Sequence, residues 1–139
     1  MKATIAARWG ITAVLVFVMF SGGVGELTHQ WGTLDTASVL GYPVYFLTII
    51  GAWKVLGSLA LLAPGFPRLK EWACAGIFFN MTGAAASHAL AGDWGPYAFH
   101  VTVTSFFALL ALALLVLRPR SAEQPAVEAA SPRLAAAVS

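Results

Sequence analysis

Residues 41–64 read GYPVYFLTIIGAWKVLGSLALLAP, and this stretch decides how the whole chain is interpreted. Its apolar part runs 19 residues from Tyr45 to Ala63, which at about 1.5 Å per residue covers a hydrocarbon core of roughly 30 Å. One charge, Lys54, interrupts it near the middle. An ammonium group at that depth costs about 2.5 kcal/mol or more unless it reaches the interface, pairs with an acid or faces a wet cavity. We therefore expect the function to centre on Lys54.

The composition favours a membrane protein. Of the 139 residues, 59% are hydrophobic and 10% are charged, against about 25% charged in an ordinary soluble domain. The lipid bilayer is thus the expected partner. The net charge of +2 comes without a cluster of basic and aromatic residues, so we predict no nucleic-acid partner. The single cysteine, Cys74, excludes an intrachain disulfide and is expected to be a small packing residue.

Four apolar segments predict an all-α fold, an integral membrane four-helix bundle. The expected spans are about 9–27, 45–63, 71–90 and 96–117, within a transmembrane domain of 9–118 that follows an N-terminal segment of residues 1–8. Residues 119–139 contain mainly Ala, Ser, Pro and Glu and are expected to form a disordered cytoplasmic tail. The first 25 residues also resemble a secretory signal, but we expect them to be retained as the first span.

Two connecting features leave structural alternatives open. The small-residue patch Ser21–Gly25 predicts either close packing against a neighbouring helix or a break in the first span. The polar linker Thr28–Pro43 is long enough for a short interfacial helix or a lid.

The distribution of Lys and Arg predicts the orientation in the membrane. Seven of the eight basic residues precede the first span, lie between the second and third, or follow the fourth, and the eighth is Lys54. The two remaining loops contain Asp35 and Asp93 but no Lys or Arg. Because basic loops stay in the cytoplasm, both termini are predicted to be cytoplasmic.

Counting along the predicted helices places five polar side chains at depth. Lys54 and Asn80 fall near the midplane, whereas Glu26, His88 and His100 fall in the outer layer. If these faces converge, they form a ligand-binding cavity that opens toward the extracytoplasmic side.

Each of these residues also fits a structural role. Lys54 and Glu26 fit a purely structural ion pair. Asn80 is of a type that more often joins helices than binds ligands, and His88 and His100 fit an ordinary interfacial position. Two histidines and a carboxylate are a possible metal-ligand set, but no HxxxH or HxxE spacing occurs, so we predict no metal site.

Several short motifs are similar to those of one known family. The resemblance covers about residues 10 to 118, and its motifs are Leu40–Pro43, Gly51, Lys54–Gly57, Leu61–Pro64, Pro67–Ala73, Ala75–Gly76, Gly83–Ala84 and Ser87–His88. Together they make the chain resemble the DoxX-like family of small bacterial membrane proteins. The resemblance implies four membrane helices, a multi-pass location in the bacterial inner (plasma) membrane, and a distant relation to the DoxD and MauE proteins. Those proteins are associated with quinone-linked sulfur oxidation and with amine dehydrogenase maturation, so a quinone is the cofactor that the resemblance suggests.

Three classes of function remain open. The first is a redox-accessory protein that holds a quinone or another amphiphile in the cavity around Lys54. The second is a structural or assembly subunit that packs against itself or a membrane partner through the small residues of span 71–90. The third is an enzyme that acts on a membrane-soluble substrate with Glu26, Lys54 and the histidines as acid–base groups. We favour the first, although the sequence identifies neither a substrate nor a partner.

Overall fold

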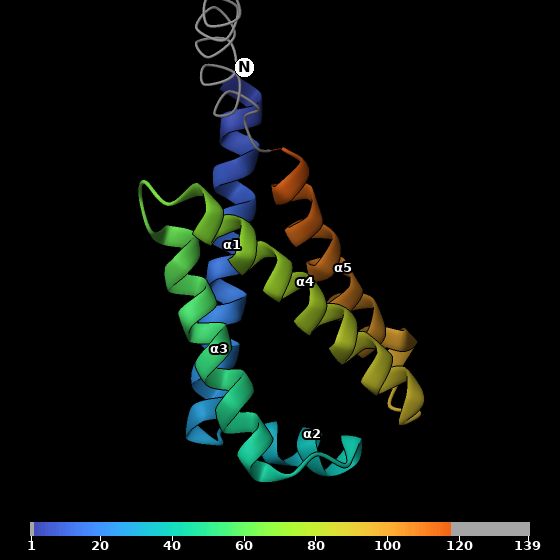
Figure 1. The fold of residues 1–139 in the computed structure, drawn as a ribbon. Helices are drawn as coiled ribbons and strands as arrows, with labels where there is room; N and C mark the ends of the chain where they lie inside the picture. Colours follow the sequence, from blue (N-terminus) through green and yellow to red (C-terminus); the bar gives the residue numbers. More distant parts are fainter. Residues whose placement is uncertain (1, 118–139) are drawn as a thin grey trace, which may run out of the picture.

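The computed structural model describes residues 2–117, except for the side chain of residue 97, and this part of the chain is all helical (Figure 1). The elements are α1 (Lys2–Thr28), α2 (Thr33–Leu40), α3 (Val44–Leu62), α4 (Pro67–Leu90), the 3-10 helix η1 (Pro96–Ala98) and α5 (Phe99–Val116). The predicted disorder of residues 119–139 lies outside the described residues.

The four long helices form two pairs. α1 packs most extensively against α3, and α4 packs most extensively against α5. The pairs meet where α3 turns into α4 and splay apart toward the end that carries α2 (Figure 1). The start of α1, the α3–α4 connection and the end of α5 therefore share one end of the molecule.

Three helices, α1, α3 and α5, are long and apolar enough to cross a membrane. They match three of the four predicted spans, and their length and composition suit a multi-pass membrane protein. The fourth, α4, is not in this set because charges at its start and polar residues such as Asn80 and His88 lower its hydropathy. α1 begins at Lys2 and α4 at Pro67, earlier than the predicted spans, because a helix can continue beyond its apolar window and proline suits a first turn.

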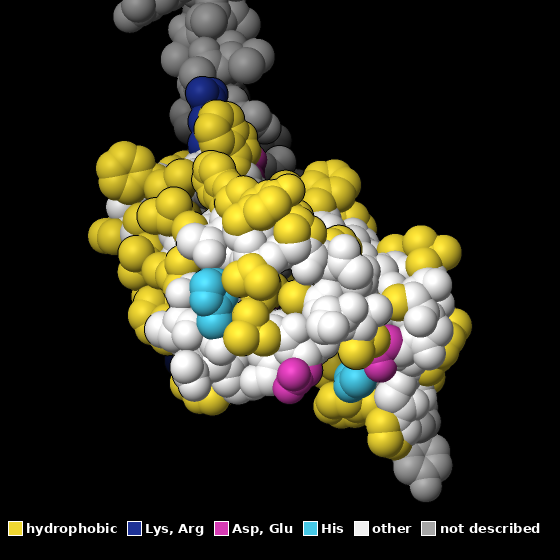
Figure 2. Space-filling view, turned by 90° about the horizontal axis from the view of Figure 1, so that it is seen from below, with side chains coloured by type: hydrophobic (Ala, Val, Ile, Leu, Met, Phe, Trp, Pro, Cys, Tyr) yellow, Lys and Arg dark blue, Asp and Glu magenta, His cyan; other side chains and the backbone are white. Residues whose placement is uncertain are grey.

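Large apolar side chains are exposed along the long helices, as expected of helices that cross a membrane. Large exposed side chains on the long helices include Trp9, Phe17, Trp53, Leu56, Trp72, Phe79, Phe106 and Leu109. Figure 2 views the end that carries α2: apolar side chains cover much of it, acidic and histidine side chains lie among them, and the Lys and Arg side chains in view lie at one edge. Charged groups thus concentrate toward the ends of the helices, with Lys54 as an exception.

The core lies where all four long helices meet. Its buried side chains are Leu15 and Met19 of α1, Leu61 of α3, Cys74, Ile77 and Met81 of α4, and Ala108, Ala111 and Leu114 of α5. Burial of Cys74 confirms its interpretation as a packing residue.

The glycine patch of α1 is a packing surface, and α1 continues through it without a break. A Cβ built on Gly23 would lie 2.9 Å from the Gly51 carbonyl oxygen, and one built on Gly51 would lie 2.8 Å from the Gly23 carbonyl oxygen. Because neither backbone can move aside locally, α1 and α3 can cross at this distance only with glycine at both positions.

The linker between α1 and α3 contains the short helix α2, which settles the alternative in favour of a helix. After α2, the Tyr42 hydroxyl hydrogen-bonds Ser87 near the end of α4. This contact joins the two helix pairs at the end where they splay apart.

Candidate functional site

Lys54 and Glu26 form an ion pair between α3 and α1. The two side chains are 14% and 15% exposed, so both are largely withdrawn from the surface. Each lies three residues after one of the glycines of the close crossing, Gly51 and Gly23. Residues three apart share a helix face, so the crossing brings the two charged groups together.

The pair leaves hydrogen-bonding capacity unused. Within the described residues, Glu26 Oε2 is buried and has no hydrogen-bond partner. An ammonium group has three donors, and the one bond recorded for Lys54 Nζ goes to Glu26 Oε1. Ser58, fully buried one turn along α3, donates to the Lys54 carbonyl oxygen at 2.7 Å and not to its side chain. A ligand or water with both donor and acceptor atoms would satisfy the pair.

A partly open groove of about 470 Å³ lies between α3 and α4, with one wall residue, Met19, from α1. Its lining residues are Met19, Ile50, Trp53, Lys54, Leu56, Gly57, Ala60, Leu69, Trp72, Ala73, Gly76, Ile77 and Asn80. Apart from the indole N–H groups of Trp53 and Trp72, the polar groups among these lining residues belong to Lys54 and Asn80, and the rest of the lining is apolar.

Two of the five predicted ligand-binding residues line this groove. Lys54 and Asn80 line the groove, and Glu26 is linked to it through Lys54 without lining it. His88 and His100 lie apart from the groove, in a second cluster. The groove therefore brings together only part of the predicted set, because residue counting gives the height of a side chain but not the neighbour that its helix face meets.

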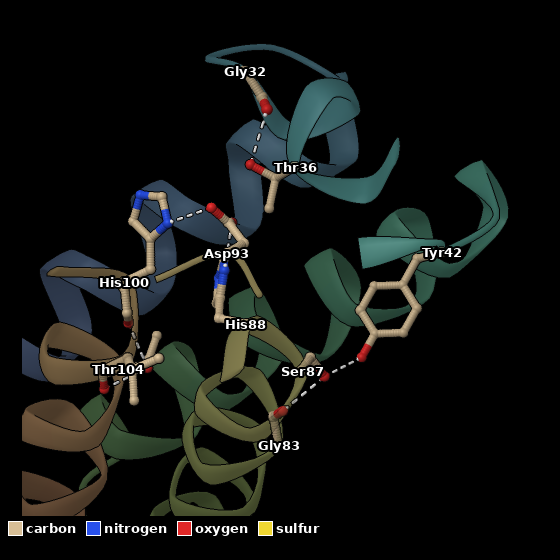
Figure 3. Close-up of polar contacts among 10 residues, drawn as sticks. Gly32, Thr36, Tyr42, Gly83, Ser87, His88, Asp93, His100 and Thr104 are labelled. Atoms are coloured by element: carbon tan, nitrogen blue, oxygen red, sulfur yellow. Dashed lines mark hydrogen bonds and ion pairs between the residues drawn. The ribbon is translucent and has the colours of Figure 1, made fainter. Parts of the chain in front are cut away.

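The second cluster brings His88 and His100 to opposite oxygens of Asp93 (Figure 3). His88 Nδ1 lies 2.8 Å from Asp93 Oδ2, and His100 Nδ1 lies 3.2 Å from Asp93 Oδ1. The imidazole centroids are 5.0 Å apart. The hydrogen bond from His88, followed by the nearby charge of His100, lowers the pKa of the Asp93 carboxyl against the opposing effect of its burial. Asp93 therefore stays ionised at neutral pH.

The turn between α4 and α5 builds this cluster. The Asp93 N–H donates to the His88 carbonyl oxygen at 2.9 Å, and the His100 N–H donates to the Trp94 carbonyl oxygen at 3.2 Å. Gly95 has a φ of 66°, and a Cβ there would lie 3.2 Å from the His100 ring. Glycine thus permits both the backbone turn and the position of the ring.

Asp93 was not among the predicted site residues. In the sequence analysis it served only to characterise a loop that contains no Lys or Arg. The signal that could have identified it is its position between the two histidines, in a turn short enough to fold back on both. The prediction of no metal site relied on helical spacing, but the tertiary structure places one ligand atom from each of His88, Asp93 and His100 within 4.8 Å of the others.

His29, which the sequence left without a role, lies elsewhere. Its Nε2 is 3.3 Å from Thr48 Oγ1 of α3, so it joins the end of α1 to α3.

Comparison with known proteins gives one match. The sequence model of the DoxX-like family matches residues 10–117, which covers all four long helices except the first residues of α1. No curated protein and no solved structure matches the chain.

Proposed function

The chain belongs to the DoxX-like family, and from this premise we propose that it is a multi-pass membrane protein that binds a membrane-soluble amphiphile in the groove between α3 and α4. We favour a quinone as the ligand, because binding a quinone would suit a redox-accessory protein. The observation that carries the proposal is the Lys54–Glu26 pair: Lys54 lines an otherwise apolar groove, and the buried Glu26 Oε2 has no hydrogen-bond partner among the described residues.

The chemistry of the lining supports an amphiphilic ligand. The apolar walls, with Trp53 and Trp72, match a ring or an acyl chain, and 470 Å³ falls within the usual range of roughly 300–1,000 Å³ for small-molecule pockets. Lys54 offers hydrogen-bond donors, and Asn80 offers both a donor and an acceptor. A ligand with a polar carbonyl or anionic head and an apolar body would use both kinds of surface.

The distribution of charged residues along the helices supports a further part of the proposal: four spans across a bacterial inner membrane, with both termini on the cytoplasmic side. Lys2 and Arg8 on α1 and Arg68 and Lys70 on α4 lie near one end of the helices, with Asp35 and Asp93 near the other. In this proposal α4 crosses the membrane because neighbouring helices shield its polar residues, which its own hydropathy does not reveal.

The assembly-subunit and enzyme alternatives stay predictions. An exposed face of α4 that carries Gly76, Gly83 and Ala86 would suit a second chain. Acid–base catalysis would require Glu26 and Lys54 to contact the substrate. A substrate in the groove would meet Lys54, which is part of its lining.

Filling the groove tests the proposal. Gly76 and Gly83 are both exposed on α4, and a Cβ at either meets no atom within 4 Å, but only Gly76 lines the groove. We expect Gly76→Leu to weaken binding of decylubiquinone at least tenfold, and Gly83→Leu, the matched control, to leave binding unchanged. Quenching of tryptophan fluorescence in lipid nanodiscs measures binding, because Trp53 and Trp72 line the site.

Lys54→Met provides a second comparison, since it keeps the apolar volume and removes the donors. Saturable quenching that weakens in Lys54→Met and Gly76→Leu supports the proposal. Quenching that rises in proportion to the quinone in the lipid and is equal in all four proteins would indicate partitioning, and would contradict a quinone site in the groove.

A further inference from the structure

We propose that His88, Asp93 and His100 form a binding site for a divalent transition-metal ion of the zinc type, at the end of the molecule that carries α2. None of the three residues lines the groove, so this site is independent of the proposed function. Three elements supply it: the last turn of α4, the following turn and the first turn of α5.

The donor set matches this class of ion. Two imidazole nitrogens and a carboxylate are ligands that Zn²⁺ commonly takes, and three protein ligands leave a fourth position for water or another ligand. Zn–N and Zn–O bonds of about 2.0–2.1 Å in a tetrahedral arrangement set ligand atoms about 3.3 Å apart. The distances from the two Nδ1 atoms to the Asp93 oxygens, 2.8 and 3.2 Å, are both slightly shorter than this spacing. Small side-chain rotations would open the cluster enough to admit an ion.

An ion would also satisfy an atom that the protein leaves unpartnered. His100 Nδ1 is buried and lacks a hydrogen bond within the described residues, although it lies 3.2 Å from Asp93 Oδ1. A buried polar atom without a partner is destabilising, and such atoms are few in folded proteins. A metal ion shared by His88, His100 and Asp93 gives His100 Nδ1 a ligand bond and replaces the proton that His88 shares with Asp93.

The surroundings hold the ligands in position. Backbone hydrogen bonds link Asp93 to His88 and His100 to Trp94, and Gly95 packs against the His100 ring. The Thr104 hydroxyl donates to the His100 carbonyl oxygen at 2.7 Å, one turn along α5 (Figure 3). All three ligand residues are partly buried, so an entering ion keeps access to solvent while losing part of its hydration.

Zinc titration of the purified full-length protein tests the proposal, after removal of any polyhistidine tag and treatment with a chelator. We expect one Zn²⁺ per chain by isothermal titration calorimetry, and a rise of about 9 °C in Tm when free Zn²⁺ is at a hundred times Kd. His88→Ala, His100→Ala and Asp93→Asn are each expected to weaken binding at least tenfold. His29→Ala is the matched control: it removes the third histidine of the chain, which lies outside the cluster, and is expected to bind zinc as the unaltered protein does.

Binding of Co²⁺ to the unaltered protein provides a second test, which does not depend on whether the substituted proteins fold. Co²⁺ bound at a site of low coordination number gives visible absorption bands stronger than those of the hydrated ion, and Zn²⁺ should displace it in a one-to-one ratio. Failure of the unaltered protein to bind either ion stoichiometrically would overturn the proposal. Binding that survives all three ligand substitutions, or that is lost in His29→Ala, would equally do so.

Discussion

At the scale of single residues, Lys54 shows how a charge is accommodated inside an apolar helix. Its backbone lies about 15 Å from the first residue of α3, close to the middle of this 19-residue helix. Its side chain reaches Glu26, near the end of α1 that adjoins α2. The long stem is thus packed among apolar groups while the ammonium group lies beside a carboxylate. The pair makes the mid-helix charge tolerable, and the unused donors of Lys54 keep it available to a ligand.

Substitution of either member tests whether the pair acts as a unit. Lys54→Met and Glu26→Gln should each lower the free energy of unfolding by about 2 kcal/mol, between the values usual for exposed and for buried ion pairs. The double substitution should recover part of the loss, because it leaves no unpaired charge. Reversible unfolding in sodium dodecyl sulfate, followed by tryptophan fluorescence, measures these values. Lys70→Met removes the same charge near a helix start and should change stability by less than about 0.5 kcal/mol. Strict additivity of the two losses would show that Lys54 and Glu26 do not interact.

At the scale of helices, the crossing of α1 and α3 explains the position of that ion pair. The carbonyl oxygens of Gly23 and Gly51 each occupy the space that a Cβ on the other residue would need. A methyl group there collides with backbone and not with a flexible side chain, so the helices themselves must separate. The charged pair, one turn away, then separates with them.

Alanine at Gly51 is therefore expected to destabilise the protein by about 1–3 kcal/mol, the usual cost of overpacking. The same substitution at Gly57, in the same helix, meets no atom within 4 Å and should be neutral or stabilising by up to about 1 kcal/mol. The unfolding assay described above measures both. Equal effects of Gly51→Ala and Gly57→Ala would mean that helix propensity, and not the close crossing, governs these positions.

At the scale of the whole molecule, the two helix pairs share a core at one end and separate toward the other. The groove lies between α3 and α4, and the histidine cluster lies where α4 ends and α5 begins. The two candidate sites are therefore on different parts of the molecule. If α4 crosses the membrane as proposed, the groove lies within the bilayer and the histidine cluster lies at its extracytoplasmic surface.

Cysteine labelling tests this arrangement. Native Cys74 is only 2% exposed and should give little background with a membrane-impermeant maleimide. Ser38→Cys in α2 and Ala91→Cys after α4 should be labelled in intact spheroplasts, whereas Pro64→Cys between α3 and α4 should react only after the membrane is opened. All three native side chains are exposed, so burial does not bias the comparison. Labelling of Ala91→Cys and Pro64→Cys from the same side would contradict a membrane crossing by α4.

The sequence alone was sufficient for the long helices and for most of the residues of interest, although not for Asp93. Continuous apolar stretches of membrane-spanning length predict α1, α3 and α5 because a backbone in lipid must satisfy its hydrogen bonds within the helix. The small, mixed residues of span 71–90 predict the packed helix α4, and the sequence motifs led to the family. Lys54, Glu26 and the two histidines were identified because polar groups are rare in such segments.

Tertiary structure decided which of these residues meet. Counting along a helix gives axial height, but packing sets the rotation of each helix and therefore its neighbour. Glu26 reaches Lys54 because glycines let α1 and α3 approach closely, a contact between residues 28 positions apart. His88 and His100 meet Asp93 and not Lys54, because the turn after α4 folds Asp93 back onto both helices. The groove is largely apolar because Glu26, His88 and His100 make their contacts outside its lining.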